Sequence, residues 1–454
     1  MKGFKLTTLV SPREAVSQKI VPRDYQQVGI DFLRDIKRGA LHDSPGLGKT
    51  IQASEAAELP ALVVAPNYIT QQWTDFLMTQ YPDLNVVNAA KGSRFQRVMK
   101  LNECDQADWI VINTEMLRSY EMPSRQTVIF DESHHLRGRV TLQALGALKV
   151  ALGTPRVYQL TGTPIYKEAD DLWMQLHLLD PINMPDYDSF LARFLDVEWK
   201  RGARSNKRVL GIRDVKGLQM LIEKYALRRS YSDVGLELPD LIEENILCPL
   251  PDIFRRKYDE TRDYWRMQEL TFDNIMQVMQ ILRMITAASP TKHEALKDLL
   301  GDIRKPTVVF CWYRDTVKVL ARQLGAYAIT GEMNATERSA LARAQNELAQ
   351  YQRTVSPYGT SHQDPPIIVA TIASLKEGVD LSNFRAVVFY EEDYTPGGTH
   401  QALSRIRRWR REGGNDEPVL AFHMLAKDTI DEIIYAKVTQ RISDVRSIIR
   451  EALE

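Results

Sequence analysis

Residues 41–50 read LHDSPGLGKT, and the interpretation of the whole chain starts from this stretch. Gly46 and Gly48 let backbone N–H groups curl round a triphosphate, and the helix expected next offers its positive N-terminal end. In such a loop Lys49 would reach the β- and γ-phosphates, and the Thr50 hydroxyl would bind Mg²⁺. The general pattern G-x-x-x-x-G-K-[ST] asks for glycine where this chain has Asp43. A glycine-rich turn before an ordinary helix therefore stays open as an alternative.

The bulk composition is that of an ordinary globular protein, with 454 residues, 44% hydrophobic and 26% charged. That length exceeds a single hydrophobic core and favours two or three domains. Lys and Arg number 59, as do Asp and Glu, so any nucleic-acid surface would be a local groove. We expect no signal peptide and no membrane-spanning segment.

The three cysteines, Cys104, Cys248 and Cys311, are far apart and odd in number. They support neither a disulfide framework nor a zinc site. A reducing, cytoplasmic compartment is the expectation.

The first part of the chain repeats one pattern: an apolar run ends in polar residues, and a helical stretch follows. The apolar runs lie in 61–66, 109–117, 127–136 and 157–164. Strands that alternate with helices predict a parallel, doubly wound sheet. Ligands bind such sheets at the carboxyl ends of the strands.

An acidic pair, Asp131 and Glu132, directly follows one of these apolar runs. The first carboxylate would hold Mg²⁺, and the second would orient or deprotonate an attacking water. A solvated turn is the alternative, and it is disfavoured because the strand belongs to the same predicted sheet as Lys49. Upstream, the amide of Gln26 has the donor and acceptor needed to pair with an adenine edge.

The second half returns to strand, loop and helix, with apolar runs in 305–315, 367–381 and 385–394. It predicts a second parallel α/β domain. Between the two domains the periodicity is helical, and the Met-rich stretch 260–288 is interpreted as core. A loop rich in Pro, Ser, Thr and Gly is expected at 353–366, and we expect it to be mobile.

Two arginines near the end of this second domain, Arg405 and Arg408, lie three residues apart within HQALSRIRRWRR (400–411). That spacing predicts one helical face. Guanidinium groups from a second domain would neutralise charge on the γ-phosphate. A plain basic patch is the alternative.

A second basic stretch, WKRGARSNKR (199–208), predicts an exposed loop. It would be either solvated surface or a contact to duplex phosphates or a branch point. Its charged residues are Lys200, Arg201, Arg204, Lys207 and Arg208.

The motifs together resemble those of superfamily-two helicases. DSPGLGKT, VIFDESHHL and LTGTP resemble motifs I, II and III, and the loop matches the Swi/Snf-like form D-x-x-G-L-G-K-T, which explains Asp43. FCWYRD, EGVDL and Q-x-x-x-R-x-x-R resemble motifs IV, V and VI. The likeness covers residues about 20 to 440, in the family order. The DESH spelling resembles the group that remodels and anneals forked DNA.

The resemblance implies an α/β fold of two RecA-like parallel-sheet lobes with a helical insertion between them. The expected limits are 1–165 for the first lobe, 166–290 for the insertion and linker, and 291–454 for the second lobe with its C-terminal helices.

The resemblance also assigns roles to residues. Catalysis falls to Lys49, Asp131, Glu132, Arg405 and Arg408, with Thr50 and Asp131 on the metal. Nucleotide binding falls to Arg23, Tyr25, Gln26, Asp43, Ser44, Pro45, Gly46, Leu47, Gly48, Lys49, Thr50, Gly378 and Asp380. Nucleic-acid contacts fall to Pro66, Asn67, Gln72, Trp73, Thr114, Trp312 and Thr371, besides the 199–208 loop. Coupling between the sites falls to His134, Thr161, Gly162, Thr163 and Gln401.

The function that follows is that of a monomeric ATP- and Mg²⁺-dependent DNA helicase or translocase, from a bacterium or a phage. It would remodel or unwind branched DNA in recombination, repair or replication. A duplex-DNA translocase without strand separation and an RNA helicase are the alternatives. An ATP-gated clamp without turnover would be expected to lack Lys49, Glu132 or an arginine finger, and all of these are present.

Overall fold

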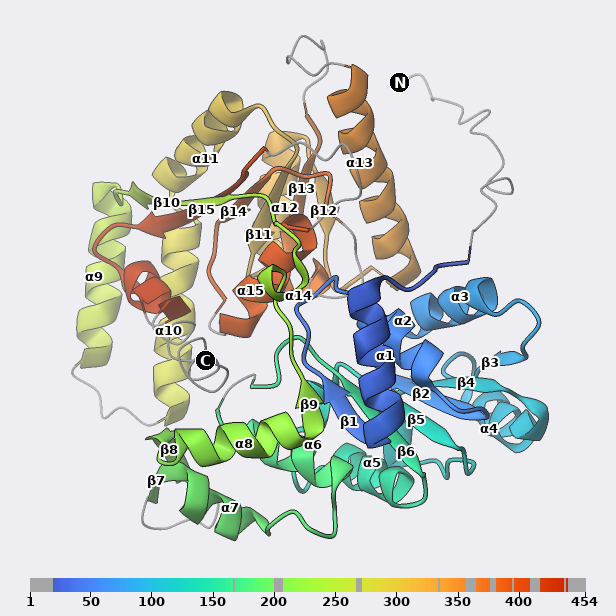
Figure 1. Ribbon diagram of the computed structural model, residues 1–454. Helices are drawn as coiled ribbons and strands as arrows, with labels where there is room; N and C mark the ends of the chain where they lie inside the picture. The colour runs from blue at the N-terminus through green and yellow to red at the C-terminus, as the bar shows by residue number, and fades with distance from the viewer. Residues whose placement is uncertain are drawn as a thin grey trace. The chain divides into compact units, whose positions relative to one another are not determined.

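The computed structural model (Figure 1) describes residues 19–165, 168–199, 207–266, 272–333, 335–355, 365–375, 381–393, 396–408, 417–436 and 438–439. The chain forms two compact units. Unit 1 comprises Met1–Leu41, Gly48–Thr161 and Met174–Asn183, and unit 2 comprises His42–Leu47, Gly162–Trp173 and Met184–Glu454.

Unit 1 is built on a parallel sheet, as the alternating pattern predicts. Its strands lie in the order β3 (Val86–Asn88), β4 (Trp109–Asn113), β2 (Ala61–Ala65), β5 (Thr127–Asp131), β6 (Arg156–Leu160) and β1 (Arg38–Leu41). The central strands β2 and β4 are buried at every position, because helices cover both faces of a parallel sheet. Those helices are α1 (Asp24–Ile36), α2 (Lys49–Ala56), α3 (Thr70–Gln80), α4 (Arg94–Asn102) and α5 (Leu142–Leu152).

Unit 2 holds a second parallel sheet, which confirms the predicted second α/β lobe. Its six strands lie in the order β10 (Leu241–Cys248), β15 (Val419–Ala426), β14 (Ala386–Phe389), β11 (Thr307–Cys311), β13 (Ile367–Thr371) and β12 (Tyr327–Ile329). The helices that follow these strands include α11 (Pro290–Ile303), α12 (Arg314–Leu324), α13 (Ala335–Val355), α14 (Ile372–Leu375) and α15 (Pro396–Ile406).

The middle of the chain is mostly helical, as expected. It contains α6 (Asp171–Leu179), α7 (Tyr187–Phe194), α8 (Val215–Tyr225), α9 (Asp252–Arg266) and α10 (Phe272–Ala287). Short 3₁₀ helices elsewhere are η1 (Cys104–Gln106), η2 (Thr114–Arg118), η3 (Ser133–Leu136) and η4 (Ser232–Val234).

The expectation that strands stop in this middle region is wrong. β7 (Leu195–Trp199) and β8 (Lys207–Ile212) form an antiparallel pair, and the short β9 (Ala226–Leu227) follows. β10 belongs to the second sheet although it precedes residue 291. β7 does alternate apolar and charged residues (LDVEW), but the pattern lasts only five residues. β8 (KRVLGI) and β10 (LIEENILC) place charged residues and apolar residues in adjacent pairs, so neither shows a period of two.

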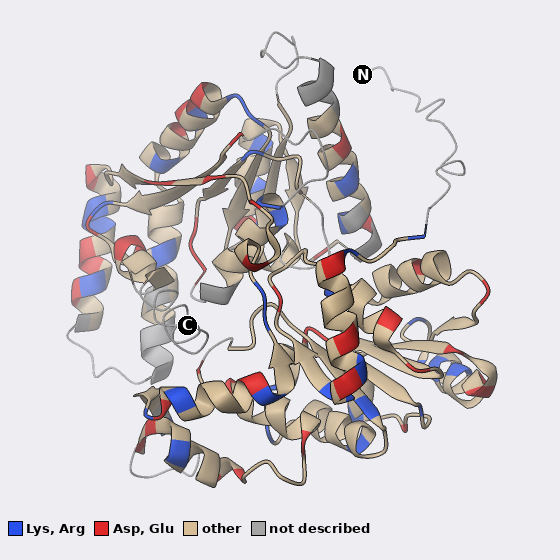
Figure 2. Cartoon of the chain, viewed as in Figure 1, with Lys and Arg blue, Asp and Glu red and all other residues tan. Residues whose placement is uncertain are grey.

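Charged residues occur on helices and on the edge of the second sheet. Figure 2 shows acidic and basic residues along α9 and acidic residues on β10, which contains Glu243 and Glu244. Among the described residues, no helix combines the length and apolar content needed to cross a bilayer.

All three cysteines are free and buried. Burial raises the pKa of the Cys104 and Cys248 thiols and lifts the pKa of Cys311 well above its usual range.

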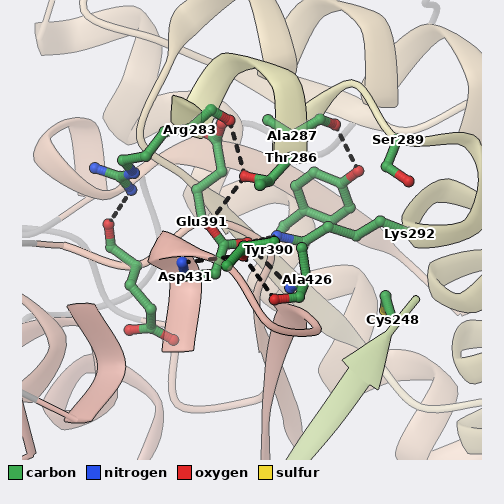
Figure 3. A network of polar contacts seen from close by, with 12 residues as sticks. Cys248, Arg283, Thr286, Ala287, Ser289, Lys292, Tyr390, Glu391, Ala426 and Asp431 are labelled. Atoms are coloured by element: carbon green, nitrogen blue, oxygen red, sulfur yellow. Dashed lines mark hydrogen bonds and ion pairs between the residues drawn. The ribbon is translucent and has the colours of Figure 1, made fainter. Parts of the chain in front are cut away.

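Within unit 2, a buried polar network connects the helical segment 430–436 to the rest of the unit (Figure 3). Lys292, only 1% exposed, donates from Nζ to Oδ2 of Asp431 at 2.7 Å. Thr286 donates to the other carboxylate oxygen at 2.9 Å, and the Ala426 N–H donates to Oδ2 at 3.1 Å. The Lys292 ammonium also lies over the ring of Tyr390, 5.0 Å from its centroid. The network therefore connects α10, α11, β15 and the helical segment 430–436.

Replacement Lys292→Met would leave the Asp431 carboxylate buried without its cation. We expect the free energy of unfolding to fall by about 3–5 kcal/mol, the usual cost of breaking a buried pair from one side. Urea unfolding followed by circular dichroism measures the change. Lys149→Met serves as the control, because Lys149 forms an exposed pair with Glu121 and should change stability by less than about 1 kcal/mol. Equal midpoints for the two variants would contradict the expectation.

A second buried pair in unit 2 joins His423 on β15 to Glu392, with Nδ1 and Oε1 2.5 Å apart. Glu243 lies 3.9 Å from Nε2 on the other side of the ring. Burial lowers the pKa of His423, but the hydrogen bonds and charges of the two glutamates raise it more, to about 9.

Because the folded-state pKa of His423 exceeds that of the unfolded chain, its contribution is complete below a pH of about 6.5 and disappears as the pH rises through 9. We expect unit 2 to lose about 3 kcal/mol of stability over that window. The measurement is a series of urea midpoints from pH 6 to 10, in the native protein and in His423→Gln. Parallel pH profiles for the two proteins would rule out this role of His423.

Candidate active site

The loop that precedes α2 has the backbone needed to surround a phosphate group. Gly46 and Gly48 have φ angles of 87° and 81°, in the left-handed region that L side chains rarely adopt. A Cβ placed on Gly48 would lie 2.1 Å from Nε2 of Gln26, so this glycine also permits a close approach. The loop runs from the end of β1 at Leu41 to the first residue of α2, Lys49. The helix expected after the glycine loop is present as α2, and a strand that the sequence did not predict, β1, precedes the loop.

The segment predicted to recognise adenine lies against this loop. Gln26 is buried at the start of α1, where its Oε1 accepts the Arg23 N–H at 2.9 Å. Its Nε2 donates to the hydroxyl of Tyr25 at 3.4 Å. Three residues predicted to bind the nucleotide therefore cluster beside Gly48.

The acidic pair lies at the carboxyl end of β5. Oδ1 of Asp131 accepts the backbone N–H of Glu132 at 2.9 Å, and Glu132 has a left-handed φ of 47°, an unusual conformation for a non-glycine residue. Burial raises the pKa of Asp131 to about 6, and the charge of Glu132 adds to the rise. The hydrogen bond from Trp73 and the charge of Lys49 act in the opposite direction. Lys49 is therefore near enough to Asp131 to stabilise its charge.

The donor set fits Mg²⁺. Two adjacent, half-buried carboxylates lie at the end of β5 in unit 1, and burial together with the charge of Glu132 raises the pKa of Asp131. A hard divalent cation with oxygen ligands would supply compensating positive charge. Asp131 and Thr50, the second residue of α2, are the residues that would hold it.

Two of the residues predicted to couple the sites, His134 and Thr161, are brought together next to the acidic pair. His134 is buried, with Nδ1 3.1 Å from Oγ1 of Thr161 and 3.3 Å from Oε2 of Glu132. One ring nitrogen of His134 thus lies close to both Glu132 and Thr161, the residue that follows β6.

Of the other residues predicted to couple the sites, Gly162 packs on the phosphate loop. A Cβ on Gly162 would lie 3.2 Å from Cδ and Cγ of Pro45. Thr163 follows in the same loop and is half-buried. Gln401 lies on α15.

Trp73 does not occupy the DNA-contacting position predicted for it. It is 2% exposed, and its indole Nε1 donates to Oδ2 of Asp131 at 2.7 Å. The ring packs into the unit 1 core from α3, so its role is to hold the carboxylate. The motif sequence does not show whether Trp73 is buried or exposed, because its partner Asp131 lies far along the chain, on β5.

The other predicted nucleic-acid residues divide into two groups. Pro66, Thr114 and Thr371 are buried, whereas Asn67, Gln72 and Trp312 are exposed. Trp312 is 37% exposed, and its backbone N–H donates to the Glu391 carboxylate at 2.7 Å. The Arg283 guanidinium lies 5.6 Å from the Trp312 ring centroid. The DNA contacts of these residues stay predictions.

The basic stretch is only partly described. Lys207 begins β8, forms an ion pair with Asp170 and lies 5.0 Å from the ring centroid of Tyr187. Arg208 follows it in β8. Lys200, Arg201 and Arg204 lie outside the described residues, as do Gly378 and Asp380 and most of the predicted 353–366 loop.

The expectation that Arg405 and Arg408 share one helical face is wrong. α15 ends at Ile406, so Arg405 lies in its last turn and Arg408 lies beyond it. Past that end, the backbone N–H of Arg408 donates to the Ile406 carbonyl at 3.1 Å. This bond spans two residues, whereas an α-helix requires bonds that span four. Arg407 is held separately, by a bond from Nε to the Pro239 carbonyl at 2.7 Å.

Comparison with known proteins agrees with this geometry. Residues 25–293 match the SNF2-related domain, which is more than half of the chain. The chain belongs to the SNF2-related family. Residues 291–410 of this SNF2-related protein also match the helicase conserved C-terminal domain. The two matches identify an enzyme of helicase superfamily two, in the Swi/Snf-like branch, and confirm the resemblance of the motifs.

Relatives of this SNF2-related chain have names that refer to chromatin and to DNA annealing. It is 25% identical to a SWI/SNF-related matrix-associated actin-dependent regulator of chromatin subfamily A-like protein 1 homolog of Caenorhabditis elegans, over 96% of this chain and 62% of that protein. It is 23% identical to the human DNA annealing helicase and endonuclease ZRANB3, over 93% of this chain and 40% of that protein. The chain thus spans 40 to 62% of the length of these relatives.

A solved Sulfolobus solfataricus SWI2/SNF2 ATPase core in complex with dsDNA is 18% identical, with a TM-score of 0.43. The similarity covers 97% of this chain and 99% of that one.

Replacement Trp73→Phe would keep the ring and remove only the donor to Asp131. We expect ATP turnover to fall by about 10- to 100-fold, with a higher Mg²⁺ concentration needed for half-maximal rate, because the metal-binding carboxylate loses its orienting bond. Steady-state hydrolysis across a Mg²⁺ titration measures both effects. The control is Trp173→Phe, which removes an indole donor to the Pro185 carbonyl. A normal Mg²⁺ titration in Trp73→Phe would exclude the positioning role.

Proposed function

We propose that this Swi/Snf-family enzyme is an ATP-dependent DNA translocase that remodels or unwinds branched DNA in recombination, repair or replication. We propose further that it acts as a monomer in the cytoplasm. The observation that carries the proposal is the continuous arrangement in unit 1 of a cation, two carboxylates and a coupling histidine: Lys49, Asp131, Glu132 and His134.

Each of these side chains has a part in hydrolysis of ATP. The Lys49 ammonium would neutralise the β- and γ-phosphates, and Glu132 would orient the attacking water. Thr50 and Asp131 would hold Mg²⁺, which when bound offsets the negative charge of the phosphates. Arg405 and Arg408 would supply further positive charge to the γ-phosphate.

The coupling path gives hydrolysis a mechanical consequence. His134 contacts the carboxylate of Glu132 and the hydroxyl of Thr161, so loss of the γ-phosphate near Glu132 would be transmitted to the loop after β6. That loop continues into Gly162, which packs on Pro45. Alternate gripping of DNA by the two lobes would convert these changes into movement.

The preference for branched DNA rests on the DESH sequence of motif II and on a relative named as an annealing helicase. The exposed Trp312, braced by Glu391 and Arg283, provides an aromatic surface for an unpaired base. Plain duplex translocation is the second candidate.

We expect hydrolysis to be stimulated most by forked and four-way DNA, less by duplex and single-stranded DNA, and least by RNA. Steady-state ATPase rates at one ionic strength with these five substrates give the ranking, because phosphate contacts are salt-dependent. Stimulation by RNA alone would overturn the DNA assignment. Equal stimulation by duplex and branched DNA would favour plain translocation.

Lys49→Ala is the control for the activity itself, and it should reduce stimulated turnover by at least about 100-fold, because the phosphates lose their cation. Lys149→Ala, on the exposed end of α5, should leave the rate unchanged. Retained turnover in Lys49→Ala would contradict the assignment of the loop.

A further inference from the structure

The aspartate that departs from the general phosphate-loop pattern has a buried partner. Asp43 is fully buried, and Arg229, which is 9% exposed, contacts both of its carboxylate oxygens. Nε donates to Oδ1 at 3.1 Å, and Nη2 donates to Oδ2 at 2.5 Å. This two-pronged geometry is one that arginine supplies and lysine does not.

Backbone bonds extend this contact along the loop. The N–H of His42 donates to the Leu227 carbonyl at 2.8 Å, and the N–H of Ser44 donates to the Arg229 carbonyl at 2.9 Å. Further on, the hydroxyl of Tyr231 donates to the Pro45 carbonyl. Residues 227–231 thus hold the first half of the phosphate loop by side chains and main chain together.

The same segment is fixed at its far end. A turn over residues 230–236 is closed by the Ser230 N–H, which donates to Asp233 at 2.6 Å, and by the Leu236 N–H, which donates to the Tyr231 carbonyl at 2.9 Å. The segment then reaches Pro239, whose carbonyl accepts Nε of Arg407. Arg407 is adjacent in sequence to Arg408 and next but one to Arg405.

We propose that residues 227–239, the strap, tie the phosphate loop to the arginine-bearing end of α15, with Arg229 as a positioning residue for ATP binding. In Figure 1 the strap lies between β9 and β10. This proposal rests on the proposed function, because it takes ATP as the ligand of the loop.

The strap holds the loop directly before the lysine that is proposed to bind the phosphates. The loop continues from Leu47 directly into Gly48 and Lys49, so a shift of Asp43 moves the backbone that leads to the phosphate-binding lysine. Tyr231 restrains the same stretch, with its hydroxyl 3.4 Å from where a Cβ on Gly46 would lie. A change in the loop is therefore transmitted along residues 227–239 to Arg407.

The test compares Asp43→Asn, Arg229→Gln and Arg407→Met, alone and in pairs. The first two should each weaken binding of a fluorescent ATP analogue by about tenfold or more, because each leaves a buried charge unpaired. The double variant Asp43→Asn/Arg229→Gln should be no weaker than either alone. Arg229→Lys should restore part of the affinity, because it keeps the charge without the fork.

The contact between Pro239 and Arg407, at the other end of the strap, is tested by measuring kcat. Arg407→Met and Arg229→Gln should each lower DNA-stimulated kcat, and their effects should not add, because both cut one tie. Matched controls are Asp259→Asn and Arg262→Gln, a pair on the surface of α9 that should leave both readouts unchanged. Tyr231→Phe, which removes only the hydroxyl donor to Pro45, replaces Arg229→Gln if that variant does not fold.

Folded variants that bind the analogue with native affinity would overturn the strap, as would additive effects on kcat. A native protein whose hydrolysis no nucleic acid stimulates would instead overturn the proposed function. Weakened analogue binding in the variants would still support the loop contact in that case.

Discussion

The left-handed backbone at Gly46 and Gly48 is the constraint on which the site depends. It turns the chain between β1 and α2 tightly enough for N–H groups to point at one phosphate. It also leaves room for Gln26, whose amide would overlap any side chain at position 48. The same glycine therefore serves the proposed phosphate loop and lets Gln26, the proposed adenine reader, lie against it.

Compensation of buried charge is the second organising principle. Burial and the charge of Glu132 raise the pKa of Asp131, and the indole of Trp73 and the charge of Lys49 offset part of that rise. Asp43 is balanced by Arg229, and Asp431 by Lys292. In each case the partners come from distant parts of the sequence, so these pairs help to fix the tertiary structure as well as the local chemistry.

Sequence predicted the features that depend on local pattern. Apolar runs such as 61–65 became buried parallel strands, and the glycine loop and the acidic pair formed where the spacing placed them. It did not predict Trp73 as a partner of Asp131 or Arg229 as a partner of Asp43, because those contacts join residues that only the folded chain brings together. The sequence did not predict β8 and β10 because adjacent charged residues break their alternation, and it did not predict β7 because its alternation lasts only five residues. The end of α15 at Ile406 was missed because the spacing of arginines carries no signal for where a helix stops.

The burial of all three native thiols makes the chain suited to site-specific labelling. Thiolate is the reactive form of cysteine, and the raised pKa values of Cys104, Cys248 and Cys311 keep its population small. A cysteine introduced on the solvent face of α4 and another on α9 would react with maleimide dyes well before the native ones. Energy transfer between two such dyes would then report the distance between the lobes through the ATP cycle, in a chain that keeps its native cysteines.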